Sequence, residues 1–214
     1  MNGQKFLTHE IGSLAKPPWL VKTSAGTPLA DSDVEHARTW GEKVGVDGYE
    51  ELVETLERGN PDKAELGHWA SRYALRLLES AGIEVVYDGE QQRTEMYAWA
   101  VDHSNGFETR GTVRSFDNKY YSKAAVVAEP SLREPYHNDE FAFLQSAANH
   151  DLKIPVTGAY TVAVWSYDEH YGPQSGRIGG VAFATSWTNS ACRVVLVLAN
   201  TFWRCVLTVA RLTP

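Results

Sequence analysis

Hydrophobic side chains recur at helical spacing along much of the N-terminal part of the chain and then give way to a short β-rich run. The helices and the strand predicted from this pattern cover residues 31–44, 49–57, 61–81 and 83–87. Asp31 or Ser32 can cap the first helix, and Gly45 interrupts it. Helix, short turn and buried strand, followed by polar residues, form the rhythm of a parallel α/β protein.

The same rhythm is predicted on either side of this stretch. Residues 5–8 are a short strand candidate that leads into a polar turn at 9–13, and Lys16-Pro17-Pro18 then forbid a regular continuation. Further along, a helix at 139–150 precedes a strand at 153–158. The chain is therefore expected to repeat the α/β unit.

An irregular stretch interrupts this repetition. Two β-rich runs, residues 107–116 and 120–128, flank the turn Asp117-Asn118-Lys119. Two such runs joined by a short turn predict a β-hairpin, here inserted into the α/β pattern.

The chain is acidic, with a formal net charge of -7 at pH 7. A protein that neutralises phosphates needs clustered Lys and Arg, so nucleic acid is not expected as a partner. The N-terminus has no apolar segment behind a basic one, which predicts a cytoplasmic location. The longest apolar run, residues 194–203, is about half of the roughly 20 residues that span a bilayer, so no membrane association is expected.

Composition changes abruptly near the C-terminal end. Every Asp and Glu lies at or before Glu169, whereas residues 172–214 contain four Arg, no Lys, and the two cysteines, Cys192 and Cys205. This segment is either a genuine basic apolar stretch or an atypical tail translated out of register with the original reading frame. The loss of the helical pattern after Trp165 favours the second interpretation. The cysteines lack the spacing of a metal or redox motif.

Three polar clusters follow predicted strands, at residues 9–13, 88–93 and 157–160. In a (β/α)8 barrel, the C-terminal ends of the strands converge on one face and form the active site. The alternative is that polar strand ends only solvate the rim of the fold. Position alone does not decide between the two.

The residues of these clusters carry a family resemblance. Thr8-His9-Glu10-Ile11-Gly12-Ser13, then VYDGEQQRTEM at 86–96, then PVTGAYT at 155–161 with Trp165-Ser166, are similar in order and approximate spacing to the catalytic domain of cobalamin-independent methionine synthase. The likeness is greatest to its short, single-barrel microbial members, and it covers about residues 5–171.

The resemblance implies the N-terminal part of a (β/α)8 TIM barrel over residues 1–171, truncated before its closing strands. The compositional break sets residues 172–214 apart as an atypical tail. It implies methyl transfer from a methylated folate, or a related donor, to the thiol of homocysteine, the reaction of a 5-methyltetrahydropteroyltriglutamate–homocysteine S-methyltransferase. These small molecules are the expected partners, and cobalamin is not expected. Two alternatives stay open: a related barrel methyltransferase that uses a corrinoid donor or another thiol, and a non-catalytic barrel fragment.

In that family an Ile-Gly-Ser turn binds the amino-acid substrate through its backbone, and this role falls here on Ile11, Gly12 and Ser13. A glycine lets the chain approach a ligand closely, and exposed N–H groups suit a carboxylate. The alternative is a tight turn enforced by Pro17-Pro18.

Two further binding roles follow from the resemblance. The family's strand-end acid, which takes the substrate ammonium, falls on Glu90, for which an ion pair with Arg93 is the alternative. The tryptophan that stacks on the pterin ring of the folate falls on Trp165, for which core packing is the alternative. Asp88 and Glu95 are expected to be structural.

The family chemistry uses a zinc ion to hold the thiolate, in a site with three ligands drawn from His, Cys and carboxylate. The family's ligands come from strands beyond the region of resemblance, so no metal ligand is assigned, and the role is not carried onto Cys192 or Cys205. Low activity is expected of the chain by itself, because the zinc-binding part is missing. The histidines show no paired spacing and are expected to lie in turns or to face solvent: His9, His36, His68, His103, His137, His150 and His170.

Overall fold

The computed structural model describes residues 7–59, 61–115 and 118–171. They form two compact units. The first unit comprises the described residues up to Gln92 together with Glu140–Lys153, and the second comprises Arg93–Asp139 and the described residues from Ile154 onward. Each unit has its own helices, strands and buried side chains, and each is described by itself.

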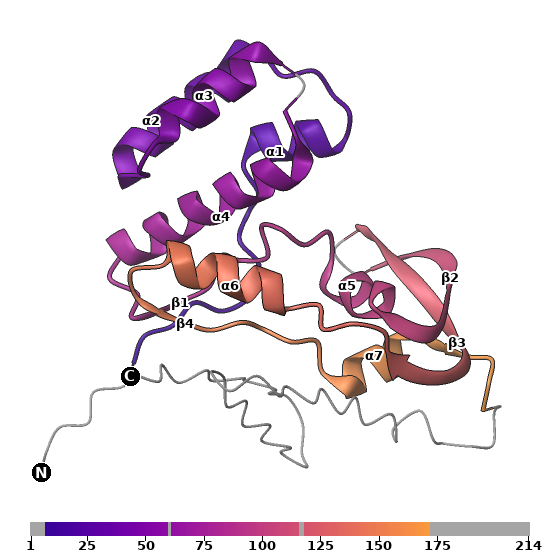
Figure 1. The fold of residues 1–214 in the computed structure, drawn as a ribbon. Coiled ribbons are helices and arrows are strands. Elements are labelled where there is room, and N and C mark those ends of the chain that lie inside the picture. Colours follow the sequence, from indigo (N-terminus) through magenta and orange to yellow (C-terminus); the bar gives the residue numbers. More distant parts are fainter. Residues whose placement is uncertain (1–6, 60, 116–117, 172–214) are drawn as a thin grey trace, which may run out of the picture. The chain divides into compact units, whose positions relative to one another are not determined.

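Four helices make up the N-terminal part of the first unit (Figure 1): α1 Pro18–Ser24, α2 Asp31–Val44, α3 Tyr49–Arg58 and α4 Lys63–Ser80. Their apolar faces meet in one core, in which Trp19, Leu52 and Leu66 are fully buried. Gly41 permits the close approach of α2 to the start of α3, because a Cβ at this position would lie 2.5 Å from Tyr49 Cγ. The amphipathic patterns of α2, α3 and α4 were all predicted from the sequence.

The start of α1 was not predicted. The helix begins at Pro18, where the sequence indicated that no regular structure would follow. Proline is tolerated at the first helical position because its missing N–H has no intrahelical acceptor there. The prolines therefore begin a helix instead of preventing one.

α2 begins at Asp31 as expected, but neither Asp31 nor Ser32 supplies its cap. Ala30 is the N-cap residue, and its N–H donates to Asp33 Oδ2 at 2.7 Å. Lys22 Nζ lies 2.6 Å from the same oxygen, and this hydrogen bond holds the pKa of Asp33 below its usual value. The acid one turn into the helix thus satisfies the first free N–H.

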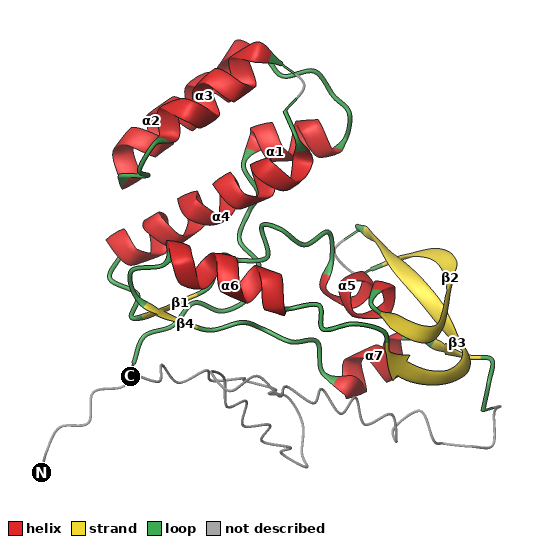
Figure 2. Ribbon diagram, viewed as in Figure 1, coloured by secondary structure: helices red, strands yellow, loops and turns green. Residues whose placement is uncertain are grey.

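The first unit also contains short parallel strands (Figure 2). β1 Val85–Val86 pairs in parallel with β4 Asp151–Leu152, and His9 forms a parallel bridge with Val85 on the other side. α6 Asn138–Ala147 precedes β4, so helix and strand follow the α/β order that was predicted. The segment around His9 and the strands β1 and β4 therefore lie side by side.

The predicted strand at 153–158 is wrong in its position. β4 ends at Leu152, and residues 153–158 are not in a strand. Lys153 N–H still donates to Val86 O at 3.0 Å, but Pro155 has no N–H with which to continue the pairing. Of the strand predicted at 5–8, residues 5 and 6 lie outside the described residues.

The second unit combines two helices with a three-stranded sheet. Its elements are α5 Met96–Asp102, β2 Ser104–Arg114, β3 Tyr120–Leu132, α7 Ala159–Trp165 and β5 Tyr167–Asp168. β2 and β3 are antiparallel, and β5 pairs in parallel with β3. Tyr97, Ala124 and Val162 form the centre of its core. An antiparallel pair therefore occupies the range of the predicted hairpin, while its insertion into a barrel stays a prediction.

α5 was not predicted. Its N-cap is Glu95, whose carboxylate accepts the N–H groups of Tyr97 and Ala98 at 2.8 and 2.9 Å. Glu95 is therefore structural, as expected. Among the helices of residues 7–59, 61–115 and 118–171, none has the length and apolar character that crossing a bilayer requires.

Candidate functional site

Two strand ends of the first unit run side by side. Glu10 N–H donates to Val85 O at 3.3 Å, and Leu14 N–H donates to Gly89 O at 3.0 Å. The Ile-Gly-Ser turn at 11–13 therefore lies between two points at which the chain is tied to the end of β1. This register places the turn next to Glu90.

Ser13 and Glu90 are in direct contact. The hydroxyl of Ser13 donates a hydrogen bond to Glu90 Oε2. Ile11, Gly12 and Ser13 are all exposed, and Gly12 has φ +84°, a conformation that residues other than glycine rarely adopt. The structure thus brings together the two groups of residues to which the resemblance gives amino-acid binding; the binding itself stays a prediction.

The backbone at Glu90 is held in an uncommon conformation. Glu90 has φ +65°, and its N–H donates to Asp88 Oδ1 at 2.9 Å. Lys16 Nζ lies 2.6 Å from the carbonyl oxygen of Glu90 and 2.7 Å from that of Gln91. Burial lowers the pKa of Lys16, and the nearby carboxylates oppose this effect. These contacts hold the backbone at Glu90, and they therefore fix the direction in which its side chain points.

Asp88 is fully buried, and its carboxylate holds this turn in place through hydrogen bonds. Ser71 of α4 donates its hydroxyl to Asp88 Oδ2 at 2.6 Å, and Gln92 Nε2 in turn donates to Ser71 Oγ at 3.1 Å. A buried carboxylate is stable only when such donors surround it. Asp88 is therefore structural, as the sequence predicted.

Sequence reasoning missed an acid and a lysine at the same strand ends. Glu10 is only 6% exposed, and Lys153 Nζ lies 3.9 Å from Glu10 Oε2. Burial raises the pKa of Glu10 to about 7, Lys153 lowers it, and the charges of Asp88 and Glu90 raise it further. The alternation of side chains along an extended segment could have indicated Glu10. Neighbouring side chains point to opposite sides, so residue 10 points inward when Ile11 points outward.

Lys153 faces two groups of the first strand end. Its Nζ is 2.9 Å from His9 Nδ1 and donates to the carbonyl oxygen of Glu10. Burial lowers the pKa of Lys153, while Glu10 raises it. The buried Glu10 and the partly buried Lys153 are thus loosely paired.

Arg93, the alternative partner of Glu90, lies in the second unit. It is buried, donates to Pro155 O at 3.0 Å and lies 3.1 Å from His137 Nδ1. His137 lies in the bend just before α6 and is only 1% exposed, so this histidine is in a turn but does not face solvent. Its place beside a buried guanidinium explains why it is enclosed.

Trp165 lies at the end of α7 in the second unit. Its Nε1 donates to Ser122 O at 3.0 Å, and its ring meets Tyr97 edge to face with centroids 6.5 Å apart. Lys123 Nζ lies 5.6 Å from the indole centroid. The half-buried indole packs against the core of this unit, and the stacking of a pterin on it stays a prediction.

The zinc that the resemblance implies finds no fitting site in the described part of the chain. No group of three or more His, Cys, Asp or Glu side chains within residues 7–59, 61–115 and 118–171 could hold a metal ion. Cys192 and Cys205 lie outside the described residues. No chemical step is therefore assigned to a metal here.

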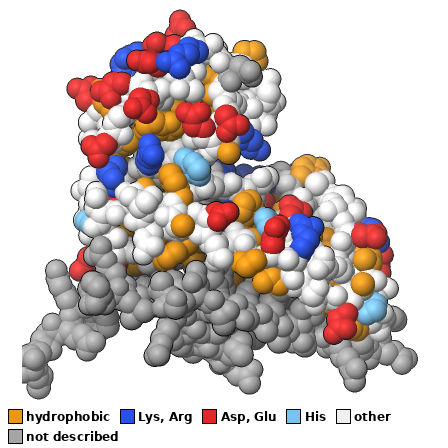
Figure 3. Space-filling view, viewed as in Figure 1, with side chains coloured by type: hydrophobic (Ala, Val, Ile, Leu, Met, Phe, Trp, Pro, Cys, Tyr) orange, Lys and Arg blue, Asp and Glu red, His pale blue; other side chains and the backbone are white. Residues whose placement is uncertain are grey.

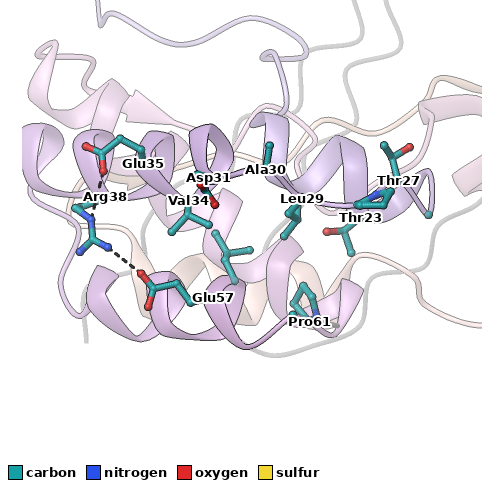
Figure 4. A pocket seen from close by; sticks show the side chains of 14 residues that line it. Thr23, Thr27, Leu29, Ala30, Asp31, Val34, Glu35, Arg38, Glu57 and Pro61 are labelled. Carbon is teal, nitrogen blue, oxygen red and sulfur yellow. Dashed lines mark hydrogen bonds and ion pairs between the residues drawn. The ribbon is translucent and has the colours of Figure 1, made fainter.

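A groove of about 790 Å³ lies elsewhere in the first unit, between the loop before α2, α2 itself and α3 (Figure 4). Val34 and Leu56 contribute apolar surface, and Arg38 bridges Glu35 and Glu57 at 3.5 and 3.0 Å. Charged side chains gather over these two helices (Figure 3). The groove contains none of the residues that the sequence predicted for the site.

The chain matches a known family and several of its members. Residues 53–186 match the sequence profile of the family described as "Cobalamin-independent synthase, Catalytic domain", a range that runs past Tyr171. The methionine synthase of Thermoplasma acidophilum is 32% identical over 167 residues, covering 78% of this chain and 40% of the relative. That of Thermococcus kodakarensis is 40% identical over 165 residues, covering 77% of this chain and 41% of the relative.

A solved structure supports the same relationship at the level of the fold. The B12-independent methionine synthase from Shewanella sp. W3-18-1, determined in complex with selenomethionine, superposes with a TM-score of 0.51 and 24% sequence identity, over 78% of this chain and 42% of that chain. The first unit and the second thus share an α/β fold with part of that protein. The chain spans about 40% of the length of the curated relatives it matches. On the family match and these relatives, the chain belongs to the family of cobalamin-independent methionine synthase catalytic domains.

Proposed function

We propose that this chain takes part in methyl transfer to the thiol of homocysteine, and that its strand-end turn and Glu90 bind the amino-acid part of the substrate. Family membership supports the reaction class. The observation that carries the assignment is the hydrogen bond from Ser13 to Glu90, because it joins the two predicted binding elements. The Shewanella relative was determined with selenomethionine, an amino acid of the product type.

The two ends of an amino acid need opposite partners. A carboxylate is suited by backbone N–H groups in an exposed turn, and residues 11–13 form such a turn with Gly12 at φ +84°. An ammonium group is suited by a carboxylate in a partly desolvated position, and Glu90 is half-buried. The proposed orientation places the substrate carboxylate at the turn and its ammonium at Glu90.

The proposed reaction balances as a simple transfer. The thiol S–H proton is lost, and the sulfur forms a bond to the methyl carbon. The bond from that carbon to the donor nitrogen of a methylated folate, or of a related donor, breaks. The nitrogen keeps the electron pair and takes up a proton. Trp165 is the proposed stacking surface for the donor's ring system.

Calorimetric titration of the chain with L-methionine tests the amino-acid site. We expect saturable binding by the wild type and a loss of affinity of about tenfold or more in Glu90→Gln, because a charge-assisted hydrogen bond is worth about 1.5–3 kcal/mol. The matched control is Glu51→Gln, an exposed acid of α3. Absence of saturable binding at millimolar ligand, or equal affinity of the wild type and Glu90→Gln, contradicts the proposal.

The methyl donor is tested separately. Calorimetric titration of the chain with a methylated folate and with a methylated corrinoid distinguishes the two donor classes, and it does not depend on zinc ligands. We expect the chain to bind the folate. Binding of the corrinoid alone contradicts the folate assignment and favours the related methyltransferase.

A further inference from the structure

Glu10 is a buried carboxylate whose only cationic contact among the described residues, with Lys153, is too long for a hydrogen bond. Its side chain is only 3% exposed, and in the described part of the chain neither Oε1 nor Oε2 has a hydrogen-bond partner. Leaving a buried polar group unsatisfied costs about 1–3 kcal/mol, and more when the group is charged. A buried carboxylate of this kind at the end of a strand can accept hydrogen bonds from the donor groups of a ligand.

The charged groups around Glu10 are mostly acids. The charges of Asp88 and Glu90 act on it from the neighbouring strand end, and Lys153 is the cation that opposes them. Lys153 Nζ stands 3.9 Å from Oε2, at the outer limit of an ion pair, and its shorter contacts go to His9 Nδ1 and the Glu10 carbonyl oxygen. The position of the carboxylate is therefore rich in negative charge and poor in donors.

Lys16, at the neighbouring strand end, does not correct this imbalance. Lys16 Nζ is held by the carbonyl oxygens of Glu90 and Gln91 at 2.6 and 2.7 Å. Gln91 is buried, and within the described residues its Oε1 also has no hydrogen-bond partner. Within the described residues, the side-chain oxygens of Glu10 and Gln91, at two neighbouring strand ends, thus accept no hydrogen bond.

We propose that Glu10 is a second anionic contact for the ammonium group of the amino-acid ligand, beside Glu90. This inference rests on the proposed function and adds a residue to it. A primary ammonium carries three N–H donors and one positive charge, which is what the carboxylate of Glu10 lacks. Glu10 and Glu90 lie at adjacent strand ends, because the hydrogen bonds of Glu10 to Val85 and of Leu14 to Gly89 hold those ends in register.

The test compares two ligands that differ only in the amino group. L-methionine and 4-(methylthio)butanoate are titrated into the wild type, Glu10→Gln and the control Glu51→Gln. We expect the preference of the wild type for L-methionine to fall about tenfold or more in Glu10→Gln, with the affinity for the analogue nearly unchanged. A structural role of Glu10 would weaken both ligands equally, and that result overturns the inference.

A second measurement needs no variant. Glu10 is partly protonated near pH 7, so an ammonium that binds beside it expels a proton, whereas the analogue without an amino group does not. Titrations of the wild type at pH 7 in two buffers of different ionisation enthalpy report this proton release. His9, Lys16, Lys153, Asp88 and Glu90 are the other groups that face the site, and they face it for both ligands. Equal proton release with both ligands overturns the inference.

The two proposals fail in different ways. If the wild type binds L-methionine and Glu10→Gln keeps the same preference, the role of Glu10 is wrong and the proposed function stands. If the wild type binds neither ligand, both are wrong. Thermal unfolding of Glu10→Gln checks that the variant is folded, and the proton release of the wild type decides the matter if it is not.

Discussion

Leu14 N–H donates to Gly89 O at 3.0 Å, and a Cβ at position 89 would lie 2.5 Å from Leu14 Cγ. Gly89 also has φ +69°. The turn that carries Ile11–Ser13 therefore rests directly on the glycine that precedes Glu90. The close approach of these two strand ends depends on the absence of a side chain at position 89.

Gly89→Ala is expected to destabilise the first unit by about 2–4 kcal/mol, because backbone strain adds to a clash that must displace Leu14. The matched control is Gly82→Ala, which has φ +78° but no atom within 4 Å of the added Cβ, and should cost about 1 kcal/mol. Urea unfolding measures both variants. Equal losses in the two would show that the contact with Leu14 is not tight.

The stability of the chain should depend on the protonation of Glu10. Its pKa is about 7 in the folded state and near 4.5 when unfolded, so the folded state binds the proton more tightly. This contribution is fully present below pH 4.5 and is lost as the pH rises through about 7, by an amount on the order of 1–3 kcal/mol. Urea unfolding at pH 4.5 to 8 should show this fall in the wild type and not in Glu10→Gln, with other titrations common to both. Parallel profiles would contradict the assignment.

Two substitutions of Trp165 should distinguish a role in packing from a role in ligand stacking. Trp165→Phe keeps an aromatic face but loses the hydrogen bond to Ser122 O, which should cost about 1 kcal/mol of stability. Trp165→Leu also loses the aromatic face, and should weaken binding of a methylated folate about three- to tenfold beyond Trp165→Phe. Calorimetry with the folate measures this. Unchanged folate affinity in Trp165→Leu would show that Trp165 serves packing only and does not stack on the donor.

Residues 172–214 contain no acid after a chain rich in them, and the family match ends at residue 186. We propose that the part of this tail beyond residue 186 is translated out of register. The DNA that encodes this part, and the DNA that follows, should then encode family-like sequence in another frame. That sequence should include Cys and His residues suited to bind zinc. Sequencing and translation in all frames is the measurement. If no frame encodes such residues, the out-of-register explanation is wrong.

Much of the helical part of the fold could be predicted because each helix carries its own signal. α2, α3 and α4 have apolar stripes, and Asp62 caps α4 by accepting the Glu65 N–H at 2.9 Å. α5 could not be found in the same way, since it is a seven-residue helix whose start depends on the Glu95 carboxylate. Short elements fixed by one polar contact leave little periodicity in the sequence.

The candidate site was predictable only in part. Ser13 and Glu90 came from family motifs, and the structure adds that they touch. Glu10 and Lys153 are 143 positions apart, and their pairing arises from the parallel order of three chain segments. No local pattern encodes a contact of that kind, because it exists only once the strands are aligned.

The most direct test of the amino-acid site is hydrogen exchange of the wild-type chain with and without L-methionine, followed by mass spectrometry of its peptides. We expect slower exchange in the peptides that cover residues 10–14 and 88–91, with no change over α2 and α3. Protection that is absent at both strand ends, or that falls on the groove between α2 and α3, would contradict the proposed amino-acid site.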